Sequence, residues 1–174
     1  MKFNEDSRVK IPAILHCMRL GYDYISLKNT TYIKDEKTNI FTDVFLKSLK
    51  KINPEVAVEE LKNYLEEILL TLEYEDLGKS FYEKLINKSG LRIIDFDNFE
   101  NNTFQVVTEL TYKNGQDEFR PDITLLVNGM PLVFVEVKKP NNKDGILAEH
   151  KRIQTRFKNS KFRNFANITQ LMIF

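Results

Sequence analysis

The sequence is poor in the residue types that build disulfides and soft metal sites. Cys17 is its one cysteine, and His16 and His150 are its two histidines. One cysteine excludes a disulfide framework and zinc sites of the CxxC type, and two histidines exclude a histidine-rich metal site. The apolar, helical surroundings of Cys17 favour a buried structural thiol over a nucleophile.

Long apolar runs are also absent. The N-terminal segment MKFNEDSRVK lacks the apolar region of a signal peptide, and no run reaches the about 20 apolar residues of a membrane span. These absences predict a protein of the reducing cytoplasm with no membrane partner. We find no internal repeat, low-complexity segment or linker. The 174 residues, 42% apolar and 29% charged, therefore suit a single domain over residues 1–174.

Charge is unevenly distributed along the chain, although the formal net charge is only +1. Acids outnumber bases over residues 42–76, whereas residues 151–174 contain Lys and Arg but no Asp or Glu. A basic C-terminal end is a candidate nucleic-acid surface, although most such runs are solvated faces.

Apolar periodicity predicts an α/β domain in which helices lead into a strand-rich centre. The expected helices cover residues 9–20, 43–52, 54–72, about 75–88 and 144–158. The expected strands cover residues 91–96, 103–112, two runs within 119–140, and a final strand within 167–174. The apolar pattern of that last strand predicts that it is buried, yet the sequence ends there without a turn or a polar tail. This favours the interpretation that the chain is the N-terminal piece of a longer protein.

The stretch FRPDITLLVNGMPLVFVEVKKP, residues 119–140, has the pattern of a hairpin around Asn128 and Gly129. In its second strand, alternation puts Glu136 and Lys138 on one face. A strict two-residue loop would set Asp122 opposite Val135, on the other face. A site formed by these three charges therefore requires an odd-length loop or a β-bulge.

Charges among apolar strand residues cost several kcal/mol each unless they are paired or bind an ion. Two carboxylates and a lysine suit a divalent cation and a phosphate ester. A lysine beside two carboxylates keeps its proton, so Lys138 is expected to orient and stabilise rather than to act as a base. The alternative is a purely structural role, in which these charges form a salt bridge at a strand end and Asp122 caps a turn after Pro121.

The spacing of these residues resembles the PD-(D/E)xK nuclease motif. Pro121 and Asp122 are followed, after thirteen residues, by Glu136, Val137 and Lys138. The longer string RPDITLLVNGMPLVFVEVKKP resembles the nuclease domain at the N-terminus of the R subunit of type I restriction endonucleases. This resemblance extends loosely to IPAILHCMRLGYDY and FRNFANITQLMIF. It implies a restriction-endonuclease-like α/β fold with a central mixed β-sheet of four to five strands flanked by helices.

The resemblance implies a Mg²⁺-dependent endodeoxyribonuclease. Asp122 and Glu136 would be the metal-binding carboxylates, the main-chain carbonyl of Val137 a further ligand, and Lys138 the catalytic lysine. Such nucleases often use another acid from the first helix, for which Glu5 is the candidate. Arg8 and Lys10 stand where the family often has acids.

The helix after the motif departs from the family, many members of which carry Gln-x-x-x-Tyr there. Gln154 is followed four residues later by Lys158. This helix and its continuation offer a basic face for DNA phosphates. The candidates are Lys151, Arg152, Arg156, Lys158, Lys161 and Arg163. The interleaved Phe157, Phe162 and Phe165 are expected to be core anchors.

The resemblance also implies partners. These are double-stranded DNA, the methyltransferase and specificity subunits of a restriction complex, and an ATP-driven motor region further along the full-length subunit. This chain has no GxxxxGK[ST] motif, so ATP is expected to bind only that motor. Two alternatives stay open: a stand-alone PD-(D/E)xK repair or junction nuclease, and a non-catalytic DNA- or subunit-docking module of the same fold.

Overall fold

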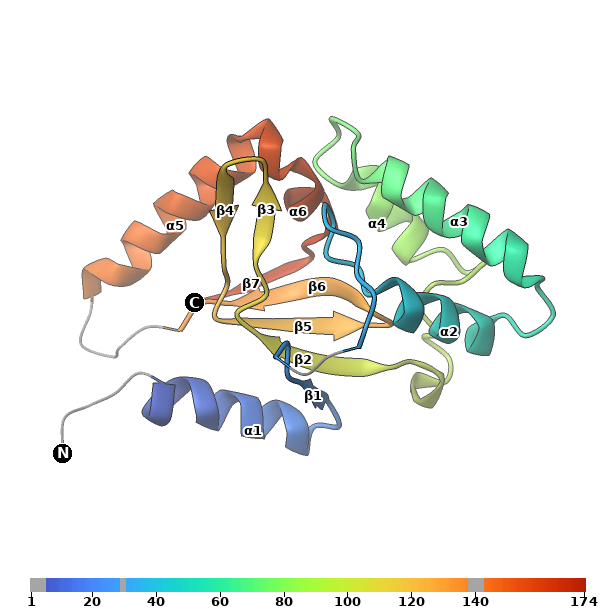
Figure 1. The fold of residues 1–174 in the computed structure, drawn as a ribbon, viewed down its shortest axis with the longest axis horizontal. Coiled ribbons are helices and arrows are strands. Elements are labelled where there is room, and N and C mark those ends of the chain that lie inside the picture. The colour runs from blue at the N-terminus through green and yellow to red at the C-terminus, as the bar shows by residue number, and fades with distance from the viewer. Residues whose placement is uncertain (1–5, 29–30, 138–142) are drawn as a thin grey trace.

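A computed structural model describes residues 6–28, 31–137 and 143–174 (Figure 1). A mixed five-stranded sheet lies at its centre, with strands in the order β1-β2-β5-β6-β7. The strands β2, β5 and β6 pair antiparallel, and β1 and β7 add in parallel at the two edges. The strand bounds are β1 Asp23–Ile25, β2 Phe104–Thr108, β5 Ile123–Val127, β6 Met130–Val135 and β7 Leu171–Ile173. The α/β class and the mixed sheet are confirmed.

Six α-helices surround the sheet in the described part of the chain. Their bounds are α1 Ile11–Arg19, α2 Thr42–Ile52, α3 Val58–Thr71, α4 Lys79–Leu85, α5 Lys143–Lys158 and α6 Arg163–Ile168. Three short helical segments add to them: η1 Asp6–Lys10, η2 Phe99–Asn101 and η3 Ser160–Phe162. No helix within the described ranges is long and apolar enough to cross a membrane.

The helices divide between the two faces of the sheet (Figure 1). The helix α1 covers one face, where Ile14 and Cys17 pack against Val106 and Ile123. Cys17 is half-buried there, and burial raises the pKa of its thiol. This placement agrees with a structural role for Cys17.

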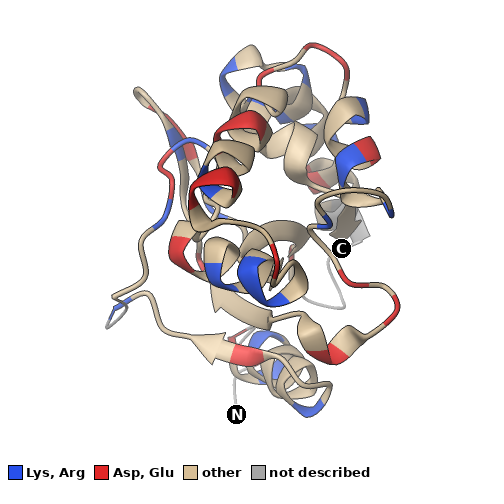
Figure 2. Cartoon of the chain, turned by 90° about the vertical axis from the view of Figure 1, so that its right-hand side faces the viewer, with Lys and Arg blue, Asp and Glu red and all other residues tan. Residues whose placement is uncertain are grey.

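The larger core fills the opposite face. The helices α2, α3 and α4 contribute Phe45, Ile68 and Phe81 to a cluster that includes Met130 and Leu132 of β6. Acidic and basic segments are interspersed along the helices on the outer side of this layer (Figure 2). These helices therefore stabilise the fold by apolar burial, while their solvent side carries both signs of charge.

A small hairpin packs beside α5 and α6. Its strands are β3 Tyr112–Asn114 and β4 Asp117–Phe119. Phe165 of α6 lies at the centre of its aromatic cluster, with ring centroids 4.5 Å from those of Tyr112 and Phe119 and 5.3 Å from that of Phe134. Phe162 is buried and Phe157 packs against the cluster, so these phenylalanines are the expected core anchors.

The strand expected over residues 91–96 is wrong, because side chains rather than a neighbouring strand satisfy its backbone. Asn128 donates to the carbonyl of Ile93, and Asn53 donates to that of Arg92. The amide of Asp95 donates to the side chain of Asn102. Ile93 is buried, so the apolar pattern reports burial and not a strand.

Other boundaries shift for local reasons. The expected strand over 103–112 breaks at Glu109, whose left-handed backbone (φ 57°) separates β2 from β3. The helix expected from residue 54 begins at Val58, and Asn53 instead follows the end of α2. Within 167–174, only Leu171–Ile173 is strand, because α6 extends to Ile168. The expected burial of this strand is wrong, because β7 lies at the edge of the sheet and Leu171 and Ile173 are exposed. The edge strand β1 has no counterpart among the sequence expectations.

Candidate active site

The hairpin between β5 and β6 turns through two residues. Val127 pairs with Met130, and both Asn128 (φ 52°) and Gly129 (φ 78°) are left-handed. Two successive positive φ angles match the right-handed twist of the strands, which is why Asn-Gly favours this turn. The side chain of Asn128 is buried, accepts a hydrogen bond from the amide of Thr103 and donates to Ile93 and Asn102.

A β-bulge then changes the pairing parity. Leu126 pairs with Pro131, but the next pair is Leu125 with Val133, so β6 contains one extra residue. Ile123 consequently pairs with Val135. The next positions outward, Asp122 and Glu136, fall opposite each other. The register required by the sequence argument is thus met, and it is met by a bulge rather than by an odd-length loop.

Asp122 and Glu136 line one pocket of about 410 Å³ at this end of the hairpin. Its other described lining residues come from the N-terminal helical segment, from the approach to β5, from just after the end of β6 and from α5: Asp6, Lys10, Arg120, Val137, Glu149, Arg152 and Arg156. Four carboxylates and four cations therefore surround the pocket. Such a lining suits a cation and a phosphate group together better than either alone.

Asp122 is tied directly to the second strand. Its Oδ2 accepts a hydrogen bond from the backbone amide of Val137 at 2.8 Å. This bond fastens the start of β5 to the residue that follows Glu136, and Glu136 is itself only 8% exposed. An ionised carboxylate has about four acceptor positions, so one amide bond leaves Asp122 able to bind a cation as well.

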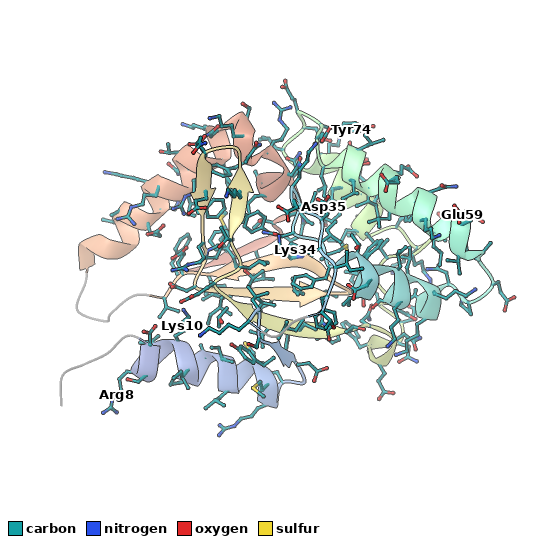
Figure 3. All side chains as sticks on the ribbon, viewed as in Figure 1. Arg8, Lys10, Lys34, Asp35, Glu59 and Tyr74 are labelled. Carbon is teal, nitrogen blue, oxygen red and sulfur yellow. The ribbon has the colours of Figure 1, made fainter. Side chains whose placement is uncertain are left out.

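Two expected site residues, Glu5 and Lys138, lie outside the described residues. Asp6, the neighbour of Glu5, does line the pocket. Figure 3 shows Lys10 directed toward the sheet and Arg8 directed away from it. The N-terminal segment thus contributes one acid and one base to this end of the sheet.

Lys10 is a buried cation that the sequence argument did not assign to the site. It is 8% exposed, and its Nζ donates to Glu109 Oε1 at 2.9 Å. Arg120 lies 3.6 Å from the other oxygen of Glu109. The hydrogen bond and charge of Lys10, with a smaller effect of Arg120, hold the pKa of Glu109 below its usual value. Glu109 therefore anchors two of the four pocket cations from outside the pocket.

Glu149 of α5 anchors the other two. Its Oε2 lies 2.9 Å from Arg152, and its Oε1 lies 3.5 Å from Arg156. Glu149 is not among the site residues expected from the sequence, although the sequence contains a signal for it. Glu149, Ile153 and Arg156 follow one another at helical spacing on one face, and Ile153 is buried. A carboxylate on the buried face of a helix requires a partner.

The remaining basic candidates, and the neutral candidate Gln154, do not converge on the pocket. Lys151 and Gln154 are exposed, and neither lines it. Lys158 and Arg163 border a separate pocket beside α6. Arg163 pairs with Glu75, and Lys161 pairs with Asp117. Of the six predicted phosphate-binding cations, the structure brings only Arg152 and Arg156 to the carboxylate pair.

The donor set fits a hard divalent cation. In the described ranges, no three His, Cys, Asp or Glu side chains are grouped as a ready-made metal cage. Mg²⁺ does not need one, because it typically takes one or two carboxylates and fills its other positions with water and phosphate oxygens. Asp122 and Glu136 are two such carboxylates, and Val137 lines the same pocket.

The fold and the pocket define a class: an α/β domain that presents opposed carboxylates and flanking cations at one end of a mixed sheet. The chain belongs to the family described as Type I restriction enzyme R protein N terminus, whose model matches residues 2–174. The family resemblance read from the hairpin motif is confirmed.

Named relatives agree with this assignment. A Methanocaldococcus jannaschii protein provisionally named type I restriction enzyme MjaIXP endonuclease subunit is 32% identical over 165 residues, covering 81% of this chain and 16% of the relative. The provisionally named MjaVIIIP endonuclease subunit of that organism is 33% identical, covering 57% of this chain and 9% of the relative. The type I restriction enzyme HindI endonuclease subunit of Haemophilus influenzae is 26% identical, covering 58% and 11%. The chain thus spans a small part of the length of each.

Proposed function

We propose that this chain is the DNA-cleaving domain of a type I restriction enzyme R subunit and hydrolyses phosphodiester bonds with Mg²⁺. One observation carries the proposal. The bulged register sets Asp122 opposite Glu136 in a pocket that also contains four cations. A structural salt bridge at a strand end would need only one cation beside the carboxylates. This pocket has both carboxylate oxygens that can bind a metal and several cations that can bind a phosphate.

Asp122 and Glu136 would hold the metal, with the Val137 carbonyl as a further ligand. When bound, Mg²⁺ supplies positive charge that polarises a phosphoryl oxygen. The chain's own part is orientation. The amide of Val137 fixes Asp122, and the burial of Glu136 limits its movement. Lys138, which follows in sequence, would stabilise the charge that develops on the phosphate.

The surrounding cations bind and orient the DNA backbone. Lys10 and Arg120 are held from one side by Glu109, and Arg152 and Arg156 from the other by Glu149. Because the named relatives are several times longer, ATP-driven translocation belongs to other parts of an R subunit in this proposal. DNA recognition and assembly with methyltransferase and specificity subunits likewise belong to the whole complex.

The test replaces Asp122 by Asn and Lys138 by Ala in the R subunit of the assembled complex. Both variants should lose DNA cleavage by at least about 100-fold, since Asp122→Asn removes a metal-binding carboxylate and Lys138→Ala removes the cation that stabilises charge on the phosphate. ATP-driven translocation should continue. Asp97→Asn is the matched control, because Asp97 is an exposed carboxylate paired with Arg92 outside the pocket. Cleavage retained by Asp122→Asn would refute the assignment, and DNA binding without cleavage by the unmodified protein would favour a non-catalytic docking module.

A further inference from the structure

Glu149 is among the most deeply buried charged residues in the described chain, at 2% exposure. A buried carboxylate is costly to desolvate, and a buried ion pair often stabilises a protein no more than an apolar pair of similar size. The burial of Glu149 is therefore better explained by the side chains that it binds than by a contribution to stability. Glu149 lines the same pocket as Asp122 and Glu136 and contacts two arginines one turn apart on α5.

Arg156 is fixed from two sides. One of its terminal nitrogens lies 3.5 Å from Glu149 Oε1, an ion pair without hydrogen-bond geometry. Its guanidinium carbon lies 4.6 Å from the ring centroid of Phe119. Phe119 is itself packed edge-on against Phe162 and Phe165. The aromatic cluster thus provides a rigid support beneath the guanidinium, and a guanidinium held in this way loses little entropy when it binds an anion.

Arg152 occupies the open side of the same carboxylate. Its side chain is 64% exposed, compared with 25% for Arg156, and it lies 2.9 Å from Glu149 Oε2. A guanidinium has five N–H donors, so a single contact to Glu149 leaves several for a second anion. The two arginines therefore present donors toward the pocket from one helix turn, on one shared anchor.

We propose that Glu149 is a positioning residue that holds Arg152 and Arg156 as a binding site for a backbone phosphate of duplex DNA, beside the carboxylates Asp122 and Glu136. This inference rests on the proposed function and deepens it. It separates Arg152 and Arg156 from the rest of the basic C-terminal end. Lys161 and Arg163 are paired with Asp117 and Glu75 elsewhere on the surface.

Neutralising Glu149 should change the affinity for DNA in the direction opposite to that expected from charge alone. If Glu149 merely added negative charge near DNA, its neutralisation would strengthen binding, because a repulsive charge would be lost. If Glu149 positions the arginines, Glu149→Gln should weaken binding, because both guanidinium groups lose their anchor. The direction of the change in affinity therefore distinguishes positioning from simple repulsion.

The experiment measures binding of a fluorescently labelled DNA duplex to the 174-residue chain by anisotropy, in EDTA and over a range of NaCl concentrations. The variants are Glu149→Gln, Arg156→Gln, Arg156→Lys and Arg152→Gln. Arg92→Gln is the matched control, since Arg92 pairs with the buried Asp95, is 32% exposed and lies outside the pocket. Circular dichroism checks folding; should Glu149→Gln unfold, the exposed Arg152→Gln still tests the site.

The plot of log K against log salt has a negative slope, and each lost phosphate contact reduces the steepness of that slope by about 0.9. We expect a loss of that size for Arg156→Gln and Arg152→Gln, up to twice that for Glu149→Gln, and none for Arg92→Gln. Arg156→Lys should keep the slope but lose Mg²⁺-dependent nicking of plasmid DNA, because an ammonium cannot replace the planar fork.

Tighter binding by Glu149→Gln would overturn the proposal, as would slopes for the pocket arginines equal to that of Arg92→Gln, or no DNA binding by the unmodified chain. Because binding is measured in EDTA, it needs no catalysis. Failure of Asp122→Asn to abolish cleavage would therefore count against the nuclease function, whereas unchanged slopes would count against the arginine site.

Discussion

Gly129 in the hairpin turn offers the sharpest test of the structure. Its φ of +78° lies in the left-handed region, and it also lies against the start of α2. A Cβ added there would lie 2.6 Å from the carbonyl oxygen of Phe41, 3.0 Å from the amide nitrogen of Phe45 and 3.2 Å from Cβ of Val44. Two of these are backbone atoms, so they cannot move aside as a flexible side chain would.

The two chain segments cannot separate easily, since the amide of Phe41 donates to the carbonyl of Gly129 at 2.9 Å. Gly129→Ala therefore combines two penalties. The left-handed backbone costs an L-residue about 1–2 kcal/mol. Forcing extra volume into a packed site adds about 1–3 kcal/mol. We expect a total loss of about 2–5 kcal/mol, a large share of the about 5–15 kcal/mol that stabilises a typical domain.

Gly115 provides the matched control. It is also left-handed (φ +63°), but an added Cβ would meet nothing within 4 Å. Gly115→Ala should therefore show the backbone penalty alone. Urea unfolding of both variants, followed by far-UV circular dichroism, measures the difference. Equal losses of stability for the two variants would refute the close packing of the turn against α2, and a stabilised Gly129→Ala would refute the turn conformation itself.

Three further substitutions test the surroundings of the site. Asn128→Ala removes the partners of the Thr103 amide and the Ile93 carbonyl and should cost ~2–5 kcal/mol in urea unfolding; a loss below ~1 kcal/mol contradicts this network. Phe165→Ala empties the centre of the aromatic cluster and should cost ~3–5 kcal/mol by the same assay; a loss below ~1 kcal/mol contradicts the close packing of that cluster. Glu109 has a lowered pKa, so its stabilisation is present above its ordinary pKa and is lost as the pH falls through the lowered value. Because Glu109 is 49% exposed, Glu109→Gln should lose under ~1 kcal/mol at neutral pH and match the unmodified chain in acid; a difference that persists in acid refutes the assignment.

The sequence pattern is sufficient to predict elements whose conformation depends on residues close together in the chain. The helical periods of α1, α2, α3 and α5 predict these helices to within a few residues, and Asn-Gly predicts the hairpin turn. Pattern fails over residues 91–96, where apolar residues are buried in an irregular segment. Their backbone groups bind the side chains of Asn53, Asn102 and Asn128, which lie outside that segment, and no local pattern reports such partners.

The candidate site divides in the same way. Alternation along a strand is a property of the backbone, so the sequence by itself placed Glu136 on the face of Phe134 and showed that Asp122 could join it only through a shifted register. The tertiary structure decides whether this shift occurs. An extra residue in β6 provides it, and that bulge depends on how the two strands and the helices above them pack. Glu149 and Lys10 are recognised as residues of the site only in the tertiary structure. Their burial and the position of the pocket depend on segments that are distant in the sequence and meet in the fold.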